Sequence, residues 1–373
     1  MLGDVYKRQG VNALYLIPGG VGGTEIYLRR LLQALAEIDT DNEYWVFTNA
    51  ETGADLVPPK PNFHYAPQNV KASVRPARIL WEQTLLPFAM RRLRIQILLN
   101  PGFTAPIITG VPQVTVFHDL QHKRHPEYFR WWDLPFWRML LFLAVHRSRA
   151  IIAVSESTRQ DLHRFYSLAA SRVKVVPHGV EKEFFHLSRM PDDARPFLLA
   201  VSTLHPHKNL DTLLRAFAHF RQGQSQWGLI VVGLRGFYTE ELEALRSTLQ
   251  LEQAVTFTGW IPREGLYALF AAAQAFVYPS LFEGFGMPVL EALAAGIPTA
   301  CSNREPMASI AGKAALLFEP TDVQAMYHAL LQITSDDSLR RELMEAGPAR
   351  AAQYSWKRAA SETLAALQES VRQ

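Results

Sequence analysis

A chain of 373 residues in which 48% are hydrophobic is too long for one ordinary core and has enough apolar mass for two domains of similar size. Its formal net charge of +3 is mild, and we expect no nucleic-acid partner. The single cysteine, Cys301, excludes an intrachain disulfide and a cysteine metal cluster, which favours a reducing compartment such as the cytoplasm.

The first half of the chain alternates between apolar strands and amphipathic helices. The string from Asp4 to Gln9 resembles a translated sequencing adapter, so we interpret residues 1–9 as a non-native scar outside the fold. An apolar run at residues 11–17 predicts a buried strand, followed by a glycine loop and a helix over residues 25–37. Further strands are predicted at residues 44–48, 95–99, 114–117, 151–154 and 173–176. Residues 10–185 therefore form a Rossmann-like N-terminal domain with a parallel sheet.

The second half repeats this pattern after a break. Residues 186–196 mix charges with two prolines and show no periodicity, which predicts a linker. Strands are then predicted at residues 197–202, 228–233, 255–258, 275–277 and 299–300, so residues 197–355 form a second doubly wound domain. The amphipathic spacing near the C-terminus predicts a last helix, and we expect residues 356–373 to pack back on the N-terminal domain.

The strongest chemical signal is a pair of carboxylates that bracket a glycine loop. Glu283 precedes the loop, Pro288 suits the first turn of a helix, and Glu291 lies about one turn inside that helix. The loop itself consists of Gly284, Phe285, Gly286 and Met287. Free N–H groups at a helix entry attract an anion or a sugar oxygen, and each carboxylate can accept two hydroxyls of a vicinal diol. A solvent-facing glutamate beside a capped helix is the alternative.

In these features the chain resembles the retaining glycosyltransferases of family four, which have the GT-B fold of two Rossmann-like domains facing across a cleft. The resemblance runs from Val11 onward and includes two glutamates separated by seven residues. It implies that the N-terminal domain binds the acceptor and the C-terminal domain binds a nucleotide-diphosphate sugar. Glu283 would contact the donor sugar and Glu291 the donor ribose.

The resemblance also assigns cations to the donor diphosphate. The segment 201–210 matches the family's strand-to-helix loop, and Lys208 matches the family lysine. A preorganised ammonium there would stabilise the charge of the leaving diphosphate. His207 and Thr203 stand where the family often has arginine, and His207 carries a full charge only when it is protonated, so the second cation stays open.

Two candidate sites lie in the first half. The resemblance places diphosphate and acceptor contacts at Gly22 and Gly23, in a loop whose alternative is a tight turn without a ligand. This loop is not a dinucleotide fingerprint, because Glu25 stands where a third glycine is expected, and an oxidoreductase is disfavoured. His118 follows a predicted strand, so we expect it to face the cleft, with a pKa near working pH. The resemblance implies that a histidine at this position lies near the anomeric carbon of the donor sugar. A purely structural histidine is the alternative.

We expect neither a cofactor nor an obligatory metal. The spacing of His118, His122 and His125 suits a metal, but Lys123 and Arg124 lie between them and would repel a cation. The string 39–41 spells Asp-x-Asp, the pattern of metal-dependent transferases, but it lies in a turn-prone run. Turn chemistry is therefore the favoured interpretation of these aspartates.

Basic and aromatic residues gather in the first half. Residues 71–150 contain 12 Lys and Arg against 4 Asp and Glu, a local charge of +8 that favours phosphate-bearing ligands or an anionic lipid surface, or else forms a solvated face. Aromatic residues near 131–137 fit a membrane interface or a buried helix equally well. No apolar run reaches the roughly 18 residues of a membrane span. We expect a cytoplasmic protein with peripheral contact to the inner face of the plasma membrane.

The combined prediction is a retaining, metal-independent hexosyltransferase. It moves a hexose, with mannose as first candidate, to a glycan or lipid-linked acceptor in cell-surface polysaccharide synthesis. Arg78, Trp81 and Glu82 support this, because they resemble a stretch in family members that build bacterial surface polysaccharides. A nucleotide-sugar epimerase of the same fold and a non-catalytic sugar-binding module are the alternatives.

Overall fold

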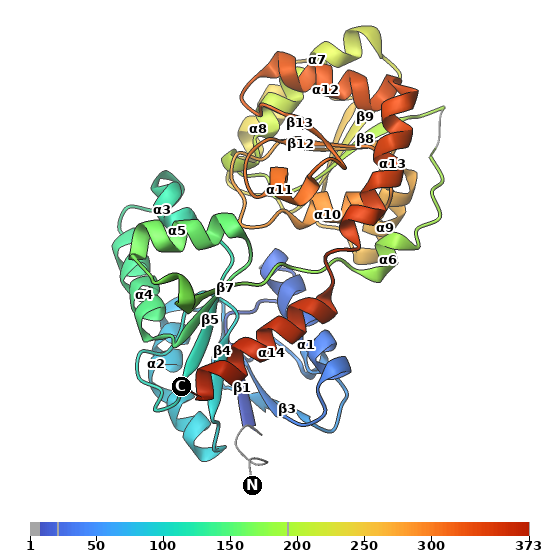
Figure 1. The fold of residues 1–373 in the computed structure, drawn as a ribbon. Helices are drawn as coiled ribbons and strands as arrows, with labels where there is room; N and C mark the ends of the chain where they lie inside the picture. The colour runs from blue at the N-terminus through green and yellow to red at the C-terminus, as the bar shows by residue number, and fades with distance from the viewer. Residues whose placement is uncertain (1–7, 21, 192–193, 373) are drawn as a thin grey trace. The chain divides into compact units, whose positions relative to one another are not determined.

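The computed structural model describes residues 8–20, 22–191 and 194–372, and these form two compact units (Figure 1). Unit 1 extends to Gly179 and includes the C-terminal residues from Trp356, and unit 2 is Val180–Ser355. The first unit therefore ends six residues before the expected boundary at 185. Residues 180–185 belong to unit 2 because the buried Glu181 pairs with Arg263 there.

Unit 1 is built on a sheet of seven parallel strands in the order β3-β2-β1-β4-β5-β6-β7. The strands are β1 (Arg8–Ala13), β2 (Glu43–Thr48), β3 (Phe63–Pro67), β4 (Ile97–Asn100), β5 (Gln113–Phe117), β6 (Ala150–Ala153) and β7 (Val173–Val175). Gln9 pairs with Tyr44 of β2 and Ile97 of β4. The expectation that residues 8 and 9 lie outside the fold is therefore wrong, and residues 1–7 lie outside the described residues.

The helices of unit 1 bury apolar faces in its core. They are α1 (Gly23–Ile38), α2 (Arg75–Arg92), α3 (Gln121–Arg124), α4 (Leu134–Arg147), α5 (Glu156–Tyr166) and α14 (Trp356–Arg372), with short 3₁₀ turns η1 (Ala54–Leu56), η2 (Pro126–Tyr128) and η3 (Ala170–Arg172). Helix α14 lies along α1 (Figure 1). Each leucine that α1 buries, such as Leu28 and Leu32, contributes about 1.5–3 kcal/mol.

Unit 2 repeats the architecture with six parallel strands in the order β10-β9-β8-β11-β12-β13. The strands are β8 (Phe197–Val201), β9 (Gly228–Val232), β10 (Val255–Gly259), β11 (Ala275–Tyr278), β12 (Thr299–Ser302) and β13 (Leu316–Phe318). The helices are α6 (Lys182–Phe185), η4 (Pro206–Lys208), α7 (Leu210–Gly223), α8 (Thr239–Thr248), α9 (Arg263–Ala272), α10 (Met287–Ala294), α11 (Met307–Ala311), α12 (Val323–Ser335) and α13 (Asp337–Ala351). The expected pair of Rossmann-like α/β domains is confirmed.

Two edge strands were not predicted. β3 mixes polar and aromatic residues and ends in a proline, and it pairs only with β2. β13 has three residues and pairs only with β12. A strand with one neighbour needs no continuous apolar run, and β3 carries none. β13 does lie in an apolar run, residues 314–318, but the strand itself is only three residues long.

Both sheets have the strand order that reverses direction at a switch point, which lies between β1 and β4 in unit 1 and between β8 and β11 in unit 2. In such sheets, ligands bind outside the carboxyl ends of the strands at the switch point. The loops that follow these four strands are therefore where the candidate residues should be sought. Among the described residues, none of the helices has both the length and the apolar character of a membrane span.

Candidate functional site

Two loops at the carboxyl edge of the sheet in unit 2 are joined by hydrogen bonds, because their strands, β8 and β11, are neighbours. The backbone carbonyl of His207 accepts from the N–H of Leu281 at 2.8 Å and from the hydroxyl of Ser280 at 3.1 Å. These bonds fix the loop that carries Lys208 against the loop that carries Glu283.

Asn209 fixes the position of Lys208 further. Its backbone has φ 57° and ψ 34°, a left-handed conformation that asparagine tolerates better than most residues. Its side-chain amide donates to the carbonyl of Pro279 at 3.1 Å and to that of Pro320 at 2.7 Å. Because Asn209 is only 4% exposed, water does not compete for these bonds. One side chain thus holds together the segments that follow β8, β11 and β13.

Lys208 and Glu283 form an ion pair at this edge. The Nζ atom of Lys208 lies 2.5 Å from Oε1 of Glu283, and each side chain is 13% exposed. The hydroxyl of Tyr278, the last residue of β11, donates to the same carboxylate oxygen at 2.7 Å. The structure therefore brings together two residues that the sequence singled out and adds a tyrosine between them.

The charges around Glu283 favour its ionised form. Burial alone would raise the pKa of Glu283, but the opposing charges of Lys208 and His207, together with two hydrogen bonds, hold that pKa below its ordinary value. Burial raises the pKa of Tyr278 well above its ordinary value, and the carboxylates of Glu283 and Glu291 raise it further. The Tyr278 hydroxyl therefore lies within electrostatic reach of both glutamates.

Glu291 is buried on α10 and is paired with an arginine. The NH2 group of Arg263 donates to Oε1 of Glu291 at 2.7 Å and also to Oε1 of Glu181. The hydroxyl of Tyr267 donates to the other oxygen of Glu181 at 2.5 Å. Burial lowers the pKa of Arg263, but the two carboxylates outweigh that effect and raise the pKa above its ordinary value. One guanidinium thus joins two acidic residues from separate parts of unit 2.

Sequence reasoning missed Tyr278, Arg263 and Glu181. Tyr278 could have been found, because it follows directly on a predicted strand at the edge where ligands bind. Arg263 could have been noticed as a cation at the first position of a helix, where the helix dipole favours acidic residues. Glu181 gives no comparable signal, since its partner lies 82 residues further along the chain.

The glycine loop before α10 forms a helix entry as expected. Gly286 is the N-cap with φ 100°, a conformation that favours glycine, and Met287 is the first helical residue. Phe285 differs from the expectation of a ligand contact, because its side chain is buried and its ring lies 6.0 Å from the ring of Tyr354. A ligand at this entry would therefore meet the backbone of Phe285 rather than its ring.

The glycine loop of unit 1 lies between β1 and α1. Gly22 is the helix N-cap with φ 57°, and Gly23 is the first residue of the helix. A Cβ at Gly22 would meet no atom within 4 Å, so the backbone conformation and not crowding favours glycine there. The carboxylate of Glu25 accepts from the N–H of Gly19 at 2.8 Å and braces the loop. Both Gly22 and Gly23 are exposed at the helix entry.

His118 lies where it was expected, after β5, but its environment differs from the prediction. It is 7% exposed, and its Nε2 lies 2.8 Å from the carbonyl oxygen of Pro101. Burial lowers the pKa of His118 to about 4, against the effect of that hydrogen bond. The expectation of a pKa near working pH is therefore wrong. With its Nε2–H donating to Pro101, neutral His118 presents a lone pair on Nδ1 and acts as an acceptor.

The other polar candidates of unit 1 have structural partners. His122 lies 2.9 Å from the hydroxyl of Tyr166, and His125 lies 3.0 Å from Glu127, so the three histidines do not converge on one point. Asp39 accepts from the N–H of Asp41, from both N–H groups of Asn42 and from the hydroxyl of Tyr44, as expected of turn chemistry.

The stretch 78–83 contributes a buried polar cluster to α2. The NH1 atom of Arg78 lies 3.4 Å from Glu82, and the hydroxyl of Thr104 donates to the same carboxylate oxygen at 2.9 Å. Burial raises the pKa of Glu82, although Arg78 and Thr104 oppose this. The cluster joins α2 to the segment that follows β4, which is one of the switch-point strands of unit 1.

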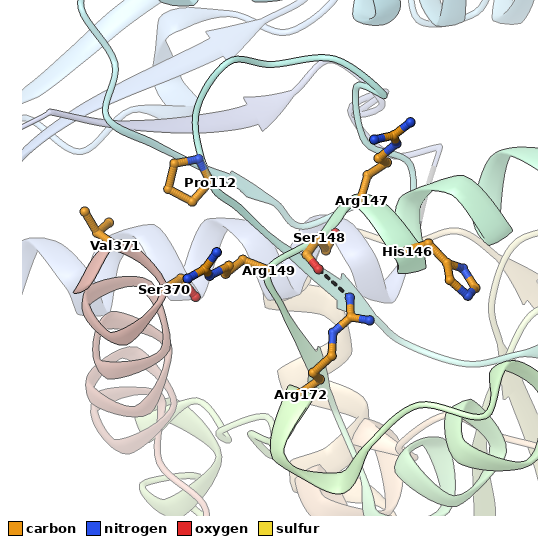
Figure 2. Close-up of a pocket in the computed structure, with 8 residues that line it drawn as sticks. All are labelled: Pro112, His146, Arg147, Ser148, Arg149, Arg172, Ser370 and Val371. Carbon is orange, nitrogen blue, oxygen red and sulfur yellow. Dashed lines mark hydrogen bonds between the residues drawn. The ribbon is translucent and has the colours of Figure 1, made fainter. Parts of the chain in front are cut away.

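A hollow of about 660 Å³ lies elsewhere in unit 1 (Figure 2). It is lined by Pro112, His146, Arg147, Ser148, Arg149, Arg172, Ser370 and Val371. Several of these residues directly precede β5 and β6, so the hollow lies at the amino-terminal edge of the sheet. Arg172 donates to the carbonyl of Ser148 at 2.6 Å, and Figure 2 shows Arg147 pointing away from this pair. The hollow lies at the wrong edge for a Rossmann-type ligand site.

Protein-family models match the two halves of the chain in succession. The model described as Glycosyltransferase Family 4 matches residues 21–184, and the model described as Glycosyl transferases group 1 matches residues 181–350. The boundary between the two matches lies close to the boundary between the two units.

Several bacterial mannosyltransferases are similar in sequence. The chain is 31% identical to the O-antigen chain mannosyltransferase B of Escherichia coli over 67% of this chain and 68% of that protein. It is 25% identical to the MMP alpha-(1->4)-mannosyltransferase of Mycolicibacterium hassiacum over 94% and 95% of the two chains. It is also 28% identical to the serotype-specific mannosyltransferase WbdA of Escherichia coli, over 56% of this chain but only 27% of that protein.

Solved structures show the same fold at lower identity. Sucrose-phosphate synthase from Thermosynechococcus elongatus has a TM-score of 0.79 at 20% identity, with 97% of this chain and 98% of that chain covered. WaaG, described as a glycosyltransferase involved in lipopolysaccharide biosynthesis, has a TM-score of 0.76 at 16% identity, with 96% and 99% covered. Anabaena HepE in complex with UDP and glucose has a TM-score of 0.75 at 19% identity, with 97% and 100% covered. These likenesses confirm the GT-B fold class.

We predict that Lys208→Met destabilises unit 2 most at neutral pH. The substitution keeps aliphatic volume but leaves the Glu283 carboxylate without its cation, which should cost about 3 kcal/mol in the free energy of unfolding. Pairing with Lys208 lowers the pKa of Glu283. The stability that this ion pair contributes is therefore fully present above the ordinary pKa of glutamate, and it is lost as the pH falls through the lowered pKa of Glu283. In the variant the cation is gone, so burial raises the pKa of Glu283 and protonation removes the unpaired buried charge as the pH falls. The difference between wild type and variant should therefore shrink from pH 7 toward pH 4.

Urea unfolding at several pH values between these limits measures that difference. Lys313→Met, which removes an exposed lysine of the same unit, is the matched control and should change little at any pH. A cost of Lys208→Met that stayed constant over this pH range would show that Glu283 is not the partner that matters.

Proposed function

This chain belongs to family 4 of the glycosyltransferases, and on that premise we propose a specific activity for it. It transfers a hexose, with mannose as first candidate, from a nucleotide-diphosphate sugar to a glycan or lipid-linked acceptor in cell-surface polysaccharide synthesis. The observation that carries this proposal is the ion pair of Lys208 and Glu283 at the switch point of unit 2. Glu291 lies within electrostatic reach of the same tyrosine hydroxyl.

The donor binds to unit 2 in this proposal. Glu291 accepts hydrogen bonds from the ribose hydroxyls and Glu283 from hydroxyls of the sugar, each bond being worth about 1.5–3 kcal/mol because the acceptor is charged. The free N–H groups at the start of α10, near Gly286 and Met287, face a phosphate oxygen, which the helix dipole also favours.

Lys208 stabilises the departing diphosphate. When the bond between the anomeric carbon and the phosphate oxygen breaks, an oxocarbenium-like sugar remains and negative charge develops on the diphosphate. The Lys208 ammonium is paired with Glu283. Donor binding would draw the ammonium toward the diphosphate and release Glu283 to accept from the sugar. The acceptor hydroxyl then attacks on the face that the diphosphate leaves and gives its proton to the departing phosphate oxygen, so the anomeric configuration is retained, as is general in this family.

Positive charge from the protein replaces a metal in this scheme. In this proposal Lys208 and the entry of α10 both contact the diphosphate, and His207 adds charge when it is protonated. The histidines of unit 1 that suggested a metal site by their spacing have separate partners. We therefore propose that transfer does not depend on a divalent cation.

Unit 1 provides the acceptor contacts. The exposed backbone of Gly22 and Gly23 lies at the entry of α1, on the carboxyl edge of the sheet. His118 lies on the same edge after β5 and, as a neutral acceptor, can take a hydrogen bond from a sugar hydroxyl. The mannosyltransferases among the relatives support mannose as the sugar and a surface polysaccharide as the product.

A panel of nucleotide sugars tests the proposed activity. With a mannose-containing acceptor present, one donor should release nucleoside diphosphate, and the rate should be the same with EDTA. Glu291→Ala should raise the donor KM at least about tenfold, because a charged acceptor of ribose hydrogen bonds is lost. Glu345→Ala, which removes an exposed glutamate of α13, is the matched control. Formation of a new sugar nucleotide without any acceptor would instead identify an epimerase and refute the proposal.

A lipid-linked acceptor implies contact with a membrane, and unit 1 has a surface suited to it. We define the aromatic patch as the exposed side chains of Trp131, Trp132, Phe136, Met139 and Phe142, which are between 44% and 79% exposed. The guanidinium of Arg130 lies 5.7 Å from the ring centre of Trp132. A buried helix is therefore the wrong interpretation for these residues, although Trp137 packs against the core. Apolar rings beside cations suit the interface of an anionic bilayer.

Vesicle sedimentation tests this contact. Wild type should bind vesicles of phosphatidylglycerol and phosphatidylcholine, and the double variant Trp131→Ala, Trp132→Ala should bind at least about tenfold more weakly because it loses the apolar area that enters the interface. Phe237→Ala removes a comparably exposed aromatic residue of unit 2 and should bind like wild type. Equal binding of the double variant and wild type would remove the aromatic patch from the proposal.

A further inference from the structure

Arg263 is held in place from four sides. Its NH2 group donates to Glu181 and to Glu291, the latter at 2.7 Å, and its guanidinium carbon lies 5.0 Å from the ring centre of Phe184 and 5.4 Å from that of Tyr267. The side chains of Glu181 and Glu291 are only 3% and 8% exposed. Two rings and two carboxylates thus leave the guanidinium little freedom to turn.

The position of this arginine in its helix is unfavourable without those partners. Arg263 is the first residue of α9, at the end of the helix where the dipole repels a cation. The segment before it follows β10, so the guanidinium comes from the same carboxyl edge of the sheet as Lys208 and Glu283. The two buried carboxylates compensate the repulsion, and in turn Arg263 compensates their charge.

We propose that Arg263 is a positioning residue that aims Glu291 at the donor ribose, and that Glu181 in turn positions Arg263. This inference rests on the proposed function, in which Glu291 accepts hydrogen bonds from the ribose. A glutamate side chain has three rotatable bonds, and the bond to Arg263 restricts them before the donor arrives. Since Arg263 engages Oε1 of Glu291, it selects one orientation of the carboxylate for the ribose.

Glu181 prevents Arg263 from pairing with Glu291 alone. If Arg263 were paired with Glu291 alone, the guanidinium could take both carboxylate oxygens in a bidentate contact and compete with the ribose hydroxyls. Glu181 accepts from the same NH2 group and is itself held by the hydroxyl of Tyr267 at 2.5 Å. The guanidinium is thereby shared between Glu181 and Glu291.

Steady-state kinetics with matched variants test the inference. Arg263→Met should raise the donor KM about tenfold while kcat stays within about threefold, because ground-state and transition-state binding of the ribose are lost together. Arg263→Lys should recover most of the affinity, since an ammonium can also bridge two carboxylates. Arg246→Met is the control, because it removes a guanidinium of unit 2 that pairs with Glu243 and stacks on Phe257 away from this edge.

The ratio of the inhibition constants of a nucleoside diphosphate and its 2′-deoxy form measures the contact to the ribose. A general loss of stability would not change this ratio. The probes are GDP and 2′-deoxy-GDP, or UDP and 2′-deoxy-UDP, according to the donor that the panel selects. Wild type should prefer the ribose form, and Arg263→Met should lose most of that preference. If Arg263→Met fails to fold, Glu181→Gln provides the same test and should raise the donor KM at least about threefold.

The outcomes separate this inference from the proposed function. If Arg263→Met, or Glu181→Gln in its place, keeps the wild-type donor KM and the wild-type preference for ribose while Glu291→Ala loses both, Arg263 does not position Glu291. If Glu291→Ala itself keeps both, the ribose role of Glu291 is wrong and the proposed donor site fails with it.

Discussion

The contact between the Lys208 ammonium and the Glu283 carboxylate is the interaction on which the candidate site depends. It joins the segments after two neighbouring strands, and the bonds of Asn209 and His207 hold those segments so that the contact can form. A lysine and a glutamate this close are stable together in a partly buried place, but each alone would be costly there. An anionic ligand can therefore take the lysine from the glutamate only if the glutamate gains hydrogen bonds in exchange. A sugar attached to a diphosphate offers both groups at once.

A second set of charges lies on the same edge and has a different character. Lys208 has a flexible stem and a single compact charge, which suits a cation that changes partner during a reaction. Arg263 has a planar guanidinium held between two rings and two carboxylates, which suits a cation that keeps its partners. The edge thus combines one mobile and one fixed cation, and each is matched with one of the two glutamates that the sequence singled out.

Much of this could be predicted from the sequence, because it depends on local patterns. Buried strands, the helix entry at Gly286 and the two glutamates all follow from residues close together in the chain. The edge strand β3 was not predicted because a strand with one neighbour needs no apolar run, and β13 was not predicted because it has only three residues. The part that Glu181 plays in the site was not predicted, because its partner Arg263 is distant in sequence. The pKa of His118 was predicted wrongly because a pKa depends on burial, and only the structure shows how deeply this side chain is buried.

A crystal structure with a bound nucleoside diphosphate gives the sharpest test of the proposed donor site. We expect phosphate oxygens within hydrogen-bonding distance of the Lys208 ammonium, at the entry of α10, and ribose hydroxyls on the carboxylate of Glu291. An ordered diphosphate elsewhere, for example among the arginines of the hollow in unit 1, with Lys208 still paired to Glu283, would contradict it (Figure 2).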